Sequence, residues 1–425
     1  MIATAKRSGR ALLRRGRAGI RLAGLALDRR REVGLRGLAL RAAGRALVGD
    51  PDVTRADAAP RPGAAFDAIY AIGYWPGEPK RYRVFNMAEG LRAAGYAVHV
   101  MPFDRLDDIR RYRWWAKALV LFRAEYDRLA GIEESLGYAR KVAMRVVYDI
   151  DDLLFDADLA QHIDGLALMG SHERRQFIAA IARRRQLLLA CDLATVSTNP
   201  LARSVTALGK PSAVIPNALN NEQLRIAAGI TDAPPRGGEV VRIGYFSGTR
   251  THQRDFAVCE PALLEIMERY PQVRLRVVGY LDLGPQWQRY GDRVERIGYL
   301  DPATLLRAVA ETDINLAPLE LGNPFCEAKS ELKFFEAAIV GVPTIASATE
   351  PFAAAIEDGV SGLLVRDVTG WLEALALLIA SANRRQAIGQ AAKERAVAHY
   401  SPAAVTPRIV AALALEAPAT GMAST

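Results

Sequence analysis

The chain has 425 residues, half of them hydrophobic, which indicates a globular protein with room for two domains of ordinary size. Its net charge of +9 is concentrated at one end, since residues 1–50 hold 13 Lys and Arg against three acidic residues. The rest holds 43 basic and 44 acidic residues, so the folded body carries no basic excess that would suggest a nucleic-acid or membrane partner.

Residues 1–60 are predicted to form a basic arm and linker. Residues 1–48 mix arginine with Leu, Ile and Ala in a loosely helical pattern, but several glycines interrupt it, each costing about 1 kcal/mol of helix stability. Two hypotheses stay open: the arm orders on an anionic membrane surface, or it is a disordered tail. Nucleic acid is disfavoured as a partner because aromatic residues do not interleave with the arginines.

Cysteine spacing and hydropathy predict a cytoplasmic protein. The cysteines show neither metal nor redox spacing, and we read them as buried thiols in a reducing compartment. No apolar run reaches the roughly 18 residues that span a bilayer, and the N-terminus lacks an apolar stretch followed by a cleavage site. The arm leaves open a peripheral position on the inner face of the membrane. The cysteines are Cys191, Cys259 and Cys326.

Strand-like and helix-like segments alternate along residues 61–220 and again along residues 239–400, with a turn-rich connector at 221–238 between them. This rhythm predicts two Rossmann-like, doubly wound α/β domains whose carboxyl sheet edges face each other across a cleft. The final helical segments are expected from Trp371 to His399 and from Pro402 to Leu415, and residues 401–425 would form the last helix and a tail. The expected strands are 68–72, 98–101, 118–122, 145–150, 193–196 and 213–215, then 240–245, 273–278, 294–297, 314–317, 344–346 and 363–365.

Three carboxylates, Asp149, Asp151 and Asp152, follow an apolar strand in VVYDIDDLLF and should lie at its cleft edge. They could form a metal-binding D-x-D pair or the nucleophile pair of a phosphatase. Both alternatives need a different surrounding fold. The third hypothesis is that the acids hydrogen-bond hydroxyls of a substrate or balance positive charge.

The segment GYFSGTRTHQRDF ends a strand and turns at Gly248, where backbone N–H groups can approach a phosphate. Arg250 is the natural charge for such a group. His252 has three possible roles: it binds the ligand, holds the loop through Asp255, or caps the following helix.

The segment GNPFCEAKSELKFFEAAIVGVPTIAS predicts a loop, a helix, a turn and a strand. On one helix Lys329, Lys333 and Glu336 would share a stripe, with Ser330 in the first turn. Two lysines at i and i+4 suggest an anion such as a phosphate, and Glu336 could accept hydrogen bonds from a ribose diol. The alternative is a solvated face on which Lys333 and Glu336 form an ion pair.

The pattern N-P-F-x-x-A-K-S-x-x-K-F-x-E-A-A-x-x-G-V-P-T-I-A-S, followed by GVSGLLV, resembles the donor site of the family 4 (group 1) glycosyltransferases of GT-B fold. The resemblance covers roughly residues 66–415 and is strongest for a subgroup with K-S-x-x-K and Y-D-I-D-D motifs. Family members commonly carry a second glutamate eight positions before the one that matches Glu336. Here that position is Ala328, and Glu327 stands beside it.

The resemblance implies a metal-independent hexosyltransferase. It would move a sugar from a nucleotide-diphosphate donor to a saccharide or lipid-linked acceptor, with retention, in polysaccharide or glycoconjugate synthesis. A C-terminal helix would cross back to the first domain. The implied catalytic residues are Lys333, Lys329, Arg250 and Asp149. The implied donor-binding residues are Gly248, Thr249, His252, Glu327, Ser330 and Glu336. The implied acceptor-side residues are Arg83, Asp151 and Asp152, with Arg81, Tyr82 and Arg123 as further cleft-facing candidates.

Two alternatives of other classes remain. One is a catalytically silent subunit that binds a sugar nucleotide, favoured by Ala328 in the place of the first glutamate. The other is a nucleotide-sugar epimerase, whose acid and base groups the sequence does not locate.

Overall fold

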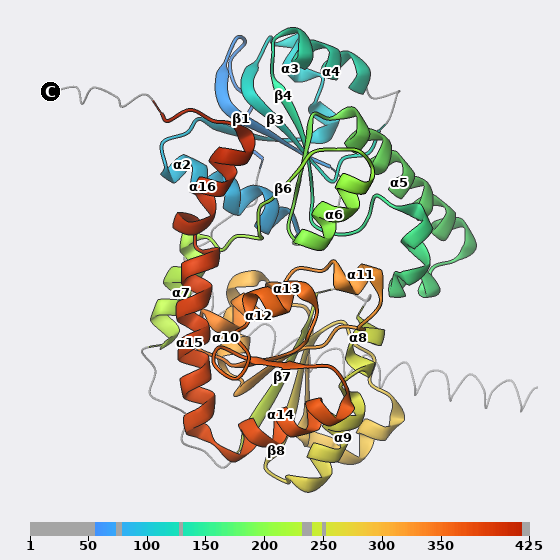
Figure 1. Ribbon diagram of the computed structural model, residues 1–425, viewed down its shortest axis with the longest axis vertical. Coiled ribbons are helices and arrows are strands. Elements are labelled where there is room, and N and C mark those ends of the chain that lie inside the picture. The colour runs from blue at the N-terminus through green and yellow to red at the C-terminus, as the bar shows by residue number, and fades with distance from the viewer. Residues whose placement is uncertain (1–55, 74–78, 127–130, 232–239, 249–251, 419–425) are drawn as a thin grey trace, which may run out of the picture.

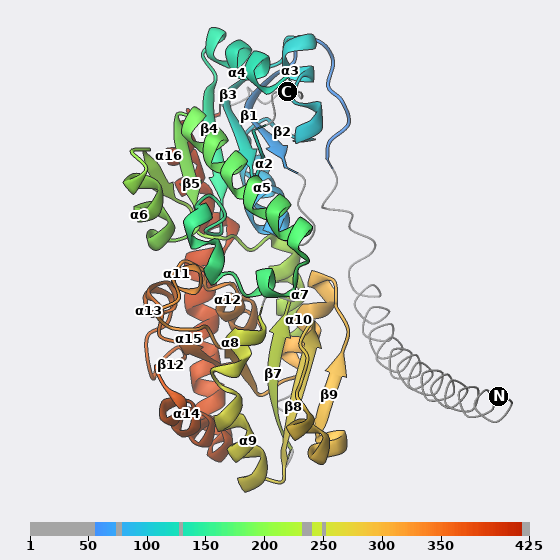
Figure 2. The ribbon, with the colours of Figure 1, turned by 90° about the vertical axis from the view of Figure 1, so that its right-hand side faces the viewer.

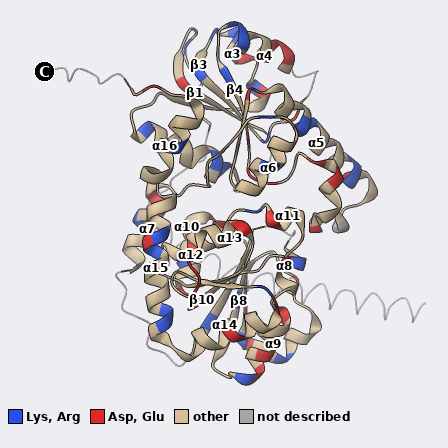
Figure 3. Ribbon diagram, in the orientation of Figure 1, with Lys and Arg blue, Asp and Glu red and all other residues tan. Residues whose placement is uncertain are grey.

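The computed structural model describes residues 56–73, 79–126, 131–231, 240–248 and 252–418. These residues form two α/β domains stacked along the long axis of the molecule (Figure 1), each built on a six-stranded parallel sheet. The arm, residues 1–48, lies outside the described residues, so the membrane and disordered-tail hypotheses stay predictions. Charges of both signs are spread over both domains (Figure 3).

The first sheet has the strand order β2-β1-β3-β4-β5-β6, and all of its pairs are parallel. Alternate residues of β1 point to opposite faces, as strand geometry requires. Ala68 and Tyr70 pack under α2 and α16, whereas Ile69 and Ala71 pack under α4 and α5. The strands are β1 Ala65–Ile72, β2 Val98–Pro102, β3 Trp115–Phe122, β4 Arg145–Ile150, β5 Leu193–Val196 and β6 Ser212–Val214.

Helices cover both faces of this sheet (Figure 2). The first helical element described after β1 is a π-helical turn, η1, which continues directly into α2. The helical elements are η1 Arg81–Phe85, α2 Asn86–Ala93, η2 Phe103–Arg105, α3 Asp108–Arg111, α4 Ile132–Lys141, η4 Ala157–His162, η5 Asp164–Leu168, α5 Ser171–Ala190 and α6 Asn199–Ala207.

The second sheet has the order β12-β11-β10-β7-β8-β9 and is also parallel. The strand order reverses between β7 and β10, and open α/β sheets bind ligands beside the carboxyl ends of the strands at such a point. The strands are β7 Val241–Ser247, β8 Val273–Gly279, β9 Val294–Ile297, β10 Ile314–Ala317, β11 Thr344–Ser347 and β12 Leu363–Val365. All six agree with the predicted strands within two residues.

The helices of the second domain differ in two places from the prediction. The predicted connector contains a helix, α7, whose Ile226 packs with Leu306 of α10, and residues 232–239 lie outside the described part. The helical region predicted from Trp371 to His399 is two helices, because Ser381 is extended and caps the second. The helical elements are α7 Asn221–Thr231, α8 Gln253–Ala257, α9 Glu260–Arg269, η6 Pro285–Arg293, α10 Pro302–Ala310, α11 Pro324–Glu327, α12 Leu332–Ala338, α13 Glu350–Ala355, α14 Val368–Ala380 and α15 Ala382–Tyr400.

The last helix crosses between the domains, as predicted. After α15 the chain turns at Ser401, which caps α16 (Pro402–Leu413) by accepting from the Ala404 N–H. Val405 and Ile409 of α16 are buried against α2 and the first sheet. None of the described helices combines the length and the apolarity that crossing a bilayer requires.

Candidate active site

The lysine-rich segment is not one helix. Helix α11 ends at Glu327, the backbone from Ala328 to Glu331 is non-helical, and α12 begins at Leu332. The prediction of a single continuous stripe is therefore wrong. The cause is tertiary: the first domain donates hydrogen bonds here, from Thr198 Oγ1 to the Ala328 carbonyl at 2.9 Å and from Asn217 Nδ2 to Ser330 Oγ at 2.8 Å.

Lys329 nevertheless reaches α8, the short helix that follows β7. Its Nζ donates to Asp255 Oδ2 at 2.8 Å and lies 5.4 Å from the ring centroid of Phe325. Burial alone would lower the pKa of Lys329, but the neighbouring Asp255 carboxylate outweighs it and raises that pKa. Lys329 is therefore a fixed positive charge at neutral pH.

Lys333, in the first turn of α12, lies close enough to Lys329 and Asp255 for their charges to affect it. Burial and then the positive charge of Lys329 lower its pKa, against the attraction of Asp255 and Glu336. Within the described residues its ammonium makes no hydrogen bond and no ion pair. A partly buried ammonium of this kind is stabilised by an anion brought in from outside.

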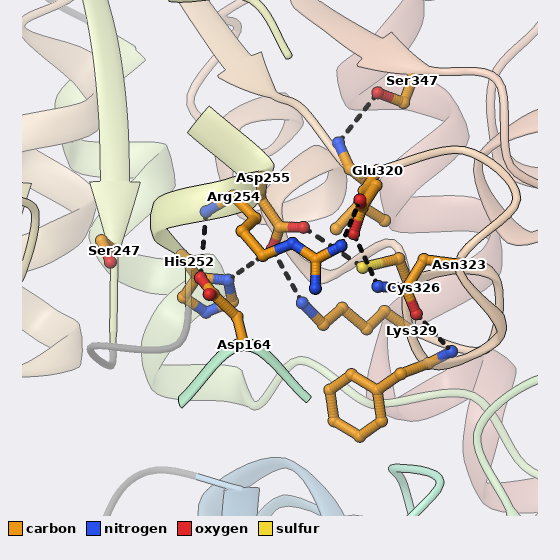
Figure 4. A network of polar contacts seen from close by, with 12 residues as sticks. Asp164, Ser247, His252, Arg254, Asp255, Glu320, Asn323, Cys326, Lys329 and Ser347 are labelled. Atoms are coloured by element: carbon orange, nitrogen blue, oxygen red, sulfur yellow. Dashed lines mark hydrogen bonds and ion pairs between the residues drawn. The ribbon is translucent and has the colours of Figure 1, made fainter. Parts of the chain in front are cut away.

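His252 and Asp255 form the centre of the contact network in Figure 4. His252 Nδ1 lies 2.8 Å from Asp255 Oδ2, as one of the three hypotheses for His252 expects, and the imidazole makes no cap to α8. Burial, then Lys333 and Lys329, lower the pKa of His252 to about 3. The ring is therefore neutral at pH 7, and because its Nδ1–H faces a carboxylate, its Nε2 is a hydrogen-bond acceptor.

Asp255 also accepts from the Cys326 thiol, with Sγ 3.2 Å from Oδ1. Burial raises the pKa of Asp255, but His252 and Lys329 outweigh it and hold that pKa well below its usual range. Burial, in contrast, raises the pKa of Cys326 to about 12, so Cys326 is a thiol and not a thiolate. The network thus joins an imidazole, a carboxylate, a thiol and an ammonium.

The remaining donor-side predictions lie around this network. Gly248 is exposed directly after β7, with open space where a Cβ would stand, and Thr249 and Arg250 lie outside the described residues. Glu327 Oε1 accepts from the Gly322 N–H at 3.0 Å. Glu336 is only 9% exposed and accepts from the hydroxyl of Tyr82, so it does not lie on the solvated face of the alternative hypothesis.

The acidic cluster of the first domain is paired with arginines. Arg83 binds Asp149 with two bonds, Nε to Oδ1 at 3.0 Å and Nη2 to Oδ2 at 2.6 Å, and Thr195 donates to the same carboxylate at 2.7 Å. Arg83 is 0% exposed, so the prediction that it faces an open cleft is wrong: its charge is neutralised in the interior. Asp149 is 2% exposed, and its catalytic role stays a prediction.

Arg123 pairs with the other two acids. Its Nε donates to Asp151 Oδ1 at 2.6 Å, and Nη2 donates to Asp152. This geometry fits the charge-balancing hypothesis for these carboxylates. Over the part of the chain that the structure describes, no group of His, Cys, Asp or Glu side chains is arranged to hold a metal ion.

A pocket of about 230 Å³ lies between the domains, and Pro216 and Tyr400 contribute to its walls. Glu331 and Glu350 line it as well, but none of the predicted donor-side residues does. The ion pair of Arg203 with Glu350 bridges the two domains next to this pocket.

Sequence comparison matches residues 254–411 to the family model described as glycosyl transferase-like. Phosphatidyl-myo-inositol mannosyltransferase of Mycobacterium tuberculosis is 29% identical over 175 residues, 40% of this chain and 44% of the relative. The Mycobacterium leprae protein of the same name is 29% identical over 222 residues, 51% of this chain and 57% of the relative. The chain thus spans about half the length of the curated relatives it matches.

Solved structures resemble the two domains together. Sucrose-phosphate synthase from Thermosynechococcus elongatus superposes with a TM-score of 0.53 at 17% identity, covering 81% of this chain and 97% of its own. Anabaena HepE in complex with UDP gives 0.51 at 16% identity, covering 82% and 99%. The fold is GT-B. The network around Asp255 lies in the C-terminal domain beside the carboxyl ends of β7 and β10, where the strand order reverses.

Proposed function

We propose that this chain is a glycosyltransferase that takes its sugar from a nucleotide-diphosphate donor. The observation that carries the proposal is the pair Lys329 and Lys333 beside the ends of β7 and β10. Two ammonium groups converge there, and only Lys329 has a carboxylate partner among the described residues. A diphosphate supplies the missing negative charge.

The chemistry of the transfer needs this charge. As the glycosidic bond to the diphosphate breaks, negative charge grows on the leaving phosphate, and positive groups already in place stabilise it. Lys333 would contact the phosphates directly, and Asp255 would hold Lys329 and His252 in position. The neutral His252 would accept a hydrogen bond from a hydroxyl of the transferred sugar.

The acceptor belongs to the proposal as well. The relatives in Mycobacterium are named for mannosyl transfer to a phosphatidyl-inositol, and HepE is described in complex with UDP. A saccharide or lipid-linked saccharide is the corresponding acceptor here, with an anionic membrane surface contacted through residues 1–48. Retention of configuration and independence of metal ions complete the proposal, as the family resemblance implies.

The test is a thermal-shift panel of UDP-, GDP-, dTDP- and ADP-linked sugars on the full chain, followed by transfer assays with the nucleotide that binds. A ligand of the native state raises the unfolding midpoint. We expect a selective shift with one nucleotide, lost in Glu336→Ala and Lys333→Ala and kept in Glu357→Ala, an exposed glutamate of the same domain. No shift with any of the four nucleotides would refute the proposal.

One observation favours a second candidate, a subunit that binds the sugar nucleotide without transferring it. Ala328 occupies the position of the family's first glutamate, which usually contacts the donor sugar. Selective nucleotide binding with neither transfer nor donor hydrolysis, over a wide acceptor panel, would support this candidate.

A further inference from the structure

The proposed ribose-binding carboxylate already has a partner from the other domain. Tyr82, in η1 of the first domain, donates its hydroxyl to Glu336 Oε1 in α12 of the second, 254 residues away. Both residues are buried, with Tyr82 3% and Glu336 9% exposed. The contact therefore lies inside the domain interface and not at its rim.

The ring of Tyr82 is held independently of its hydroxyl. It packs in the hydrophobic cluster of the second domain with Leu219 and Phe335, and its centroid lies 6.3 Å from that of Phe335 in an edge-on arrangement. Gln223 of α7 approaches the Tyr82 hydroxyl at 3.5 Å and also accepts from Asn86 at 3.1 Å. Removing the hydroxyl alone would leave this packing in place.

Other bonds from the first domain to the same segment involve different groups. Thr198 bonds the carbonyl of Ala328 and Asn217 bonds the hydroxyl of Ser330. Neither uses the carboxylate of Glu336. Both can therefore persist when Glu336 changes its partner.

A tyrosine hydroxyl and a ribose hydroxyl offer the same group to a carboxylate, one O–H donor. A ribose diol that binds one carboxylate places a hydroxyl at each of its oxygens, and Tyr82 already occupies a lone-pair site of Oε1. Glu336 is only 9% exposed, so a second donor can approach Oε1 only through the space that the Tyr82 hydroxyl takes up. Tyr82 and the ribose of the donor therefore compete for the same acceptor.

We propose that Tyr82 is a built-in competitor of the donor, which holds Glu336 when no nucleotide is bound and releases it when the ribose arrives. The inference rests on the proposed function. It adds that a residue of the first domain, Tyr82, lowers the affinity of the second domain for the donor. A ligand that must displace an internal partner binds more weakly than the same ligand on a vacant group.

The test compares Tyr82→Phe with the wild-type full chain by calorimetric titration of UDP and of GDP. The control variant is Tyr290→Phe, another buried tyrosine whose hydroxyl lies 3.0 Å from a glutamate, Glu268, but which lies outside the proposed site. We expect about tenfold tighter nucleotide binding in Tyr82→Phe, the size of one hydrogen bond to a charged group, and no change in Tyr290→Phe.

A second titration, with a nucleotide that lacks the ribose hydroxyls, tests whether the ribose is the competing group. For the 2′,3′-dideoxy analogue of the same nucleotide, Tyr82→Phe should bind no more tightly than wild type, because the analogue has no ribose hydroxyl that competes with Tyr82 for Glu336. Unchanged or weaker UDP or GDP binding in Tyr82→Phe would overturn the inference, weaker binding showing that Tyr82 orients Glu336. If neither wild type nor variant binds UDP or GDP, the titration is repeated with ADP and dTDP, and absence of binding to all four would refute the proposed function, and the inference with it.

Discussion

Lys329 and Asp255, whose Nζ and Oδ2 lie 2.8 Å apart, join the segment after β10 to α8, the helix after β7. The order of the second sheet reverses between these two neighbouring strands. The carboxylate of Asp255 is the shared partner of three groups, since His252 and Cys326 also contact it. Much of the geometry of the candidate site therefore depends on one buried side chain.

Asp255→Asn should destabilise the protein by about 3 kcal/mol, because breaking a buried ion pair leaves the other charge uncompensated. Asp255 is 2% exposed, so water does not replace it. Chemical unfolding of variant and wild type measures the difference. Asp292→Asn, whose side chain is 92% exposed, is the control and should be neutral. A loss of less than about 1 kcal/mol in Asp255→Asn would show that the network is not coupled.

The two lysines should respond oppositely to replacement by methionine. Lys329→Met removes the ionic partner of Asp255 and should lower stability. Lys333→Met removes a charge that burial and Lys329 disfavour, and should raise stability by about 1 kcal/mol. Both variants should bind the nucleotide at least tenfold more weakly. Thermal unfolding with and without nucleotide measures both properties, and a destabilised Lys333→Met would contradict the assignment of an unsatisfied ammonium.

The pKa of His252 makes stability depend on pH. Its value is about 3 in the folded protein against 6.5 for an ordinary histidine, so between these limits the unfolded chain binds a proton that the native ring does not. Stability should therefore fall as the pH drops below 6.5, by up to about 1.4 kcal/mol per pH unit. Unfolding measured between pH 4.5 and 7.5 tests this slope.

His252→Asn should flatten that profile, because an amide keeps a donor for Asp255 without titrating. His172→Asn, at an exposed position in α5, is the matched control and should leave the wild-type slope intact. If the stability of His252→Asn changes with pH as steeply as that of wild type, other groups cause the pH dependence.

The sequence predicts the strands well because each is a short β-type run bounded by turn residues, as at Leu193–Val196, where prediction and structure coincide. It fails at Ala328, where the side chains of Thr198 and Asn217 donate to the Ala328 carbonyl and the Ser330 hydroxyl and interrupt a segment of strong helix formers. Local propensity contains no information on partners more than a hundred residues away. For the same reason the sequence does not predict the contact of Tyr82 with Glu336, although it predicts that both are site residues.

Asp149 offers the last prediction, which separates a catalytic role from a structural one. Its carboxylate is bound by Arg83 and Thr195 in the interior, and Asp149→Asn should therefore lower stability by about 3 kcal/mol by leaving the guanidinium unpaired. The double variant Arg83→Met with Asp149→Leu should be less destabilised than Asp149→Asn, because it removes both charges together. Chemical unfolding of the three proteins measures this.

Transfer or donor-hydrolysis rates of the folded fraction decide between the two roles. With a structural role, Asp149→Asn retains most of the wild-type turnover at a temperature well below its unfolding midpoint. A matched variant, Asp152→Asn, changes a carboxylate of the same cluster whose side chain is 29% exposed and should affect stability less. If Asp149→Asn is as stable as wild type but loses turnover by a hundredfold or more, the carboxylate takes part in the chemistry and its pairing with Arg83 must open during the reaction.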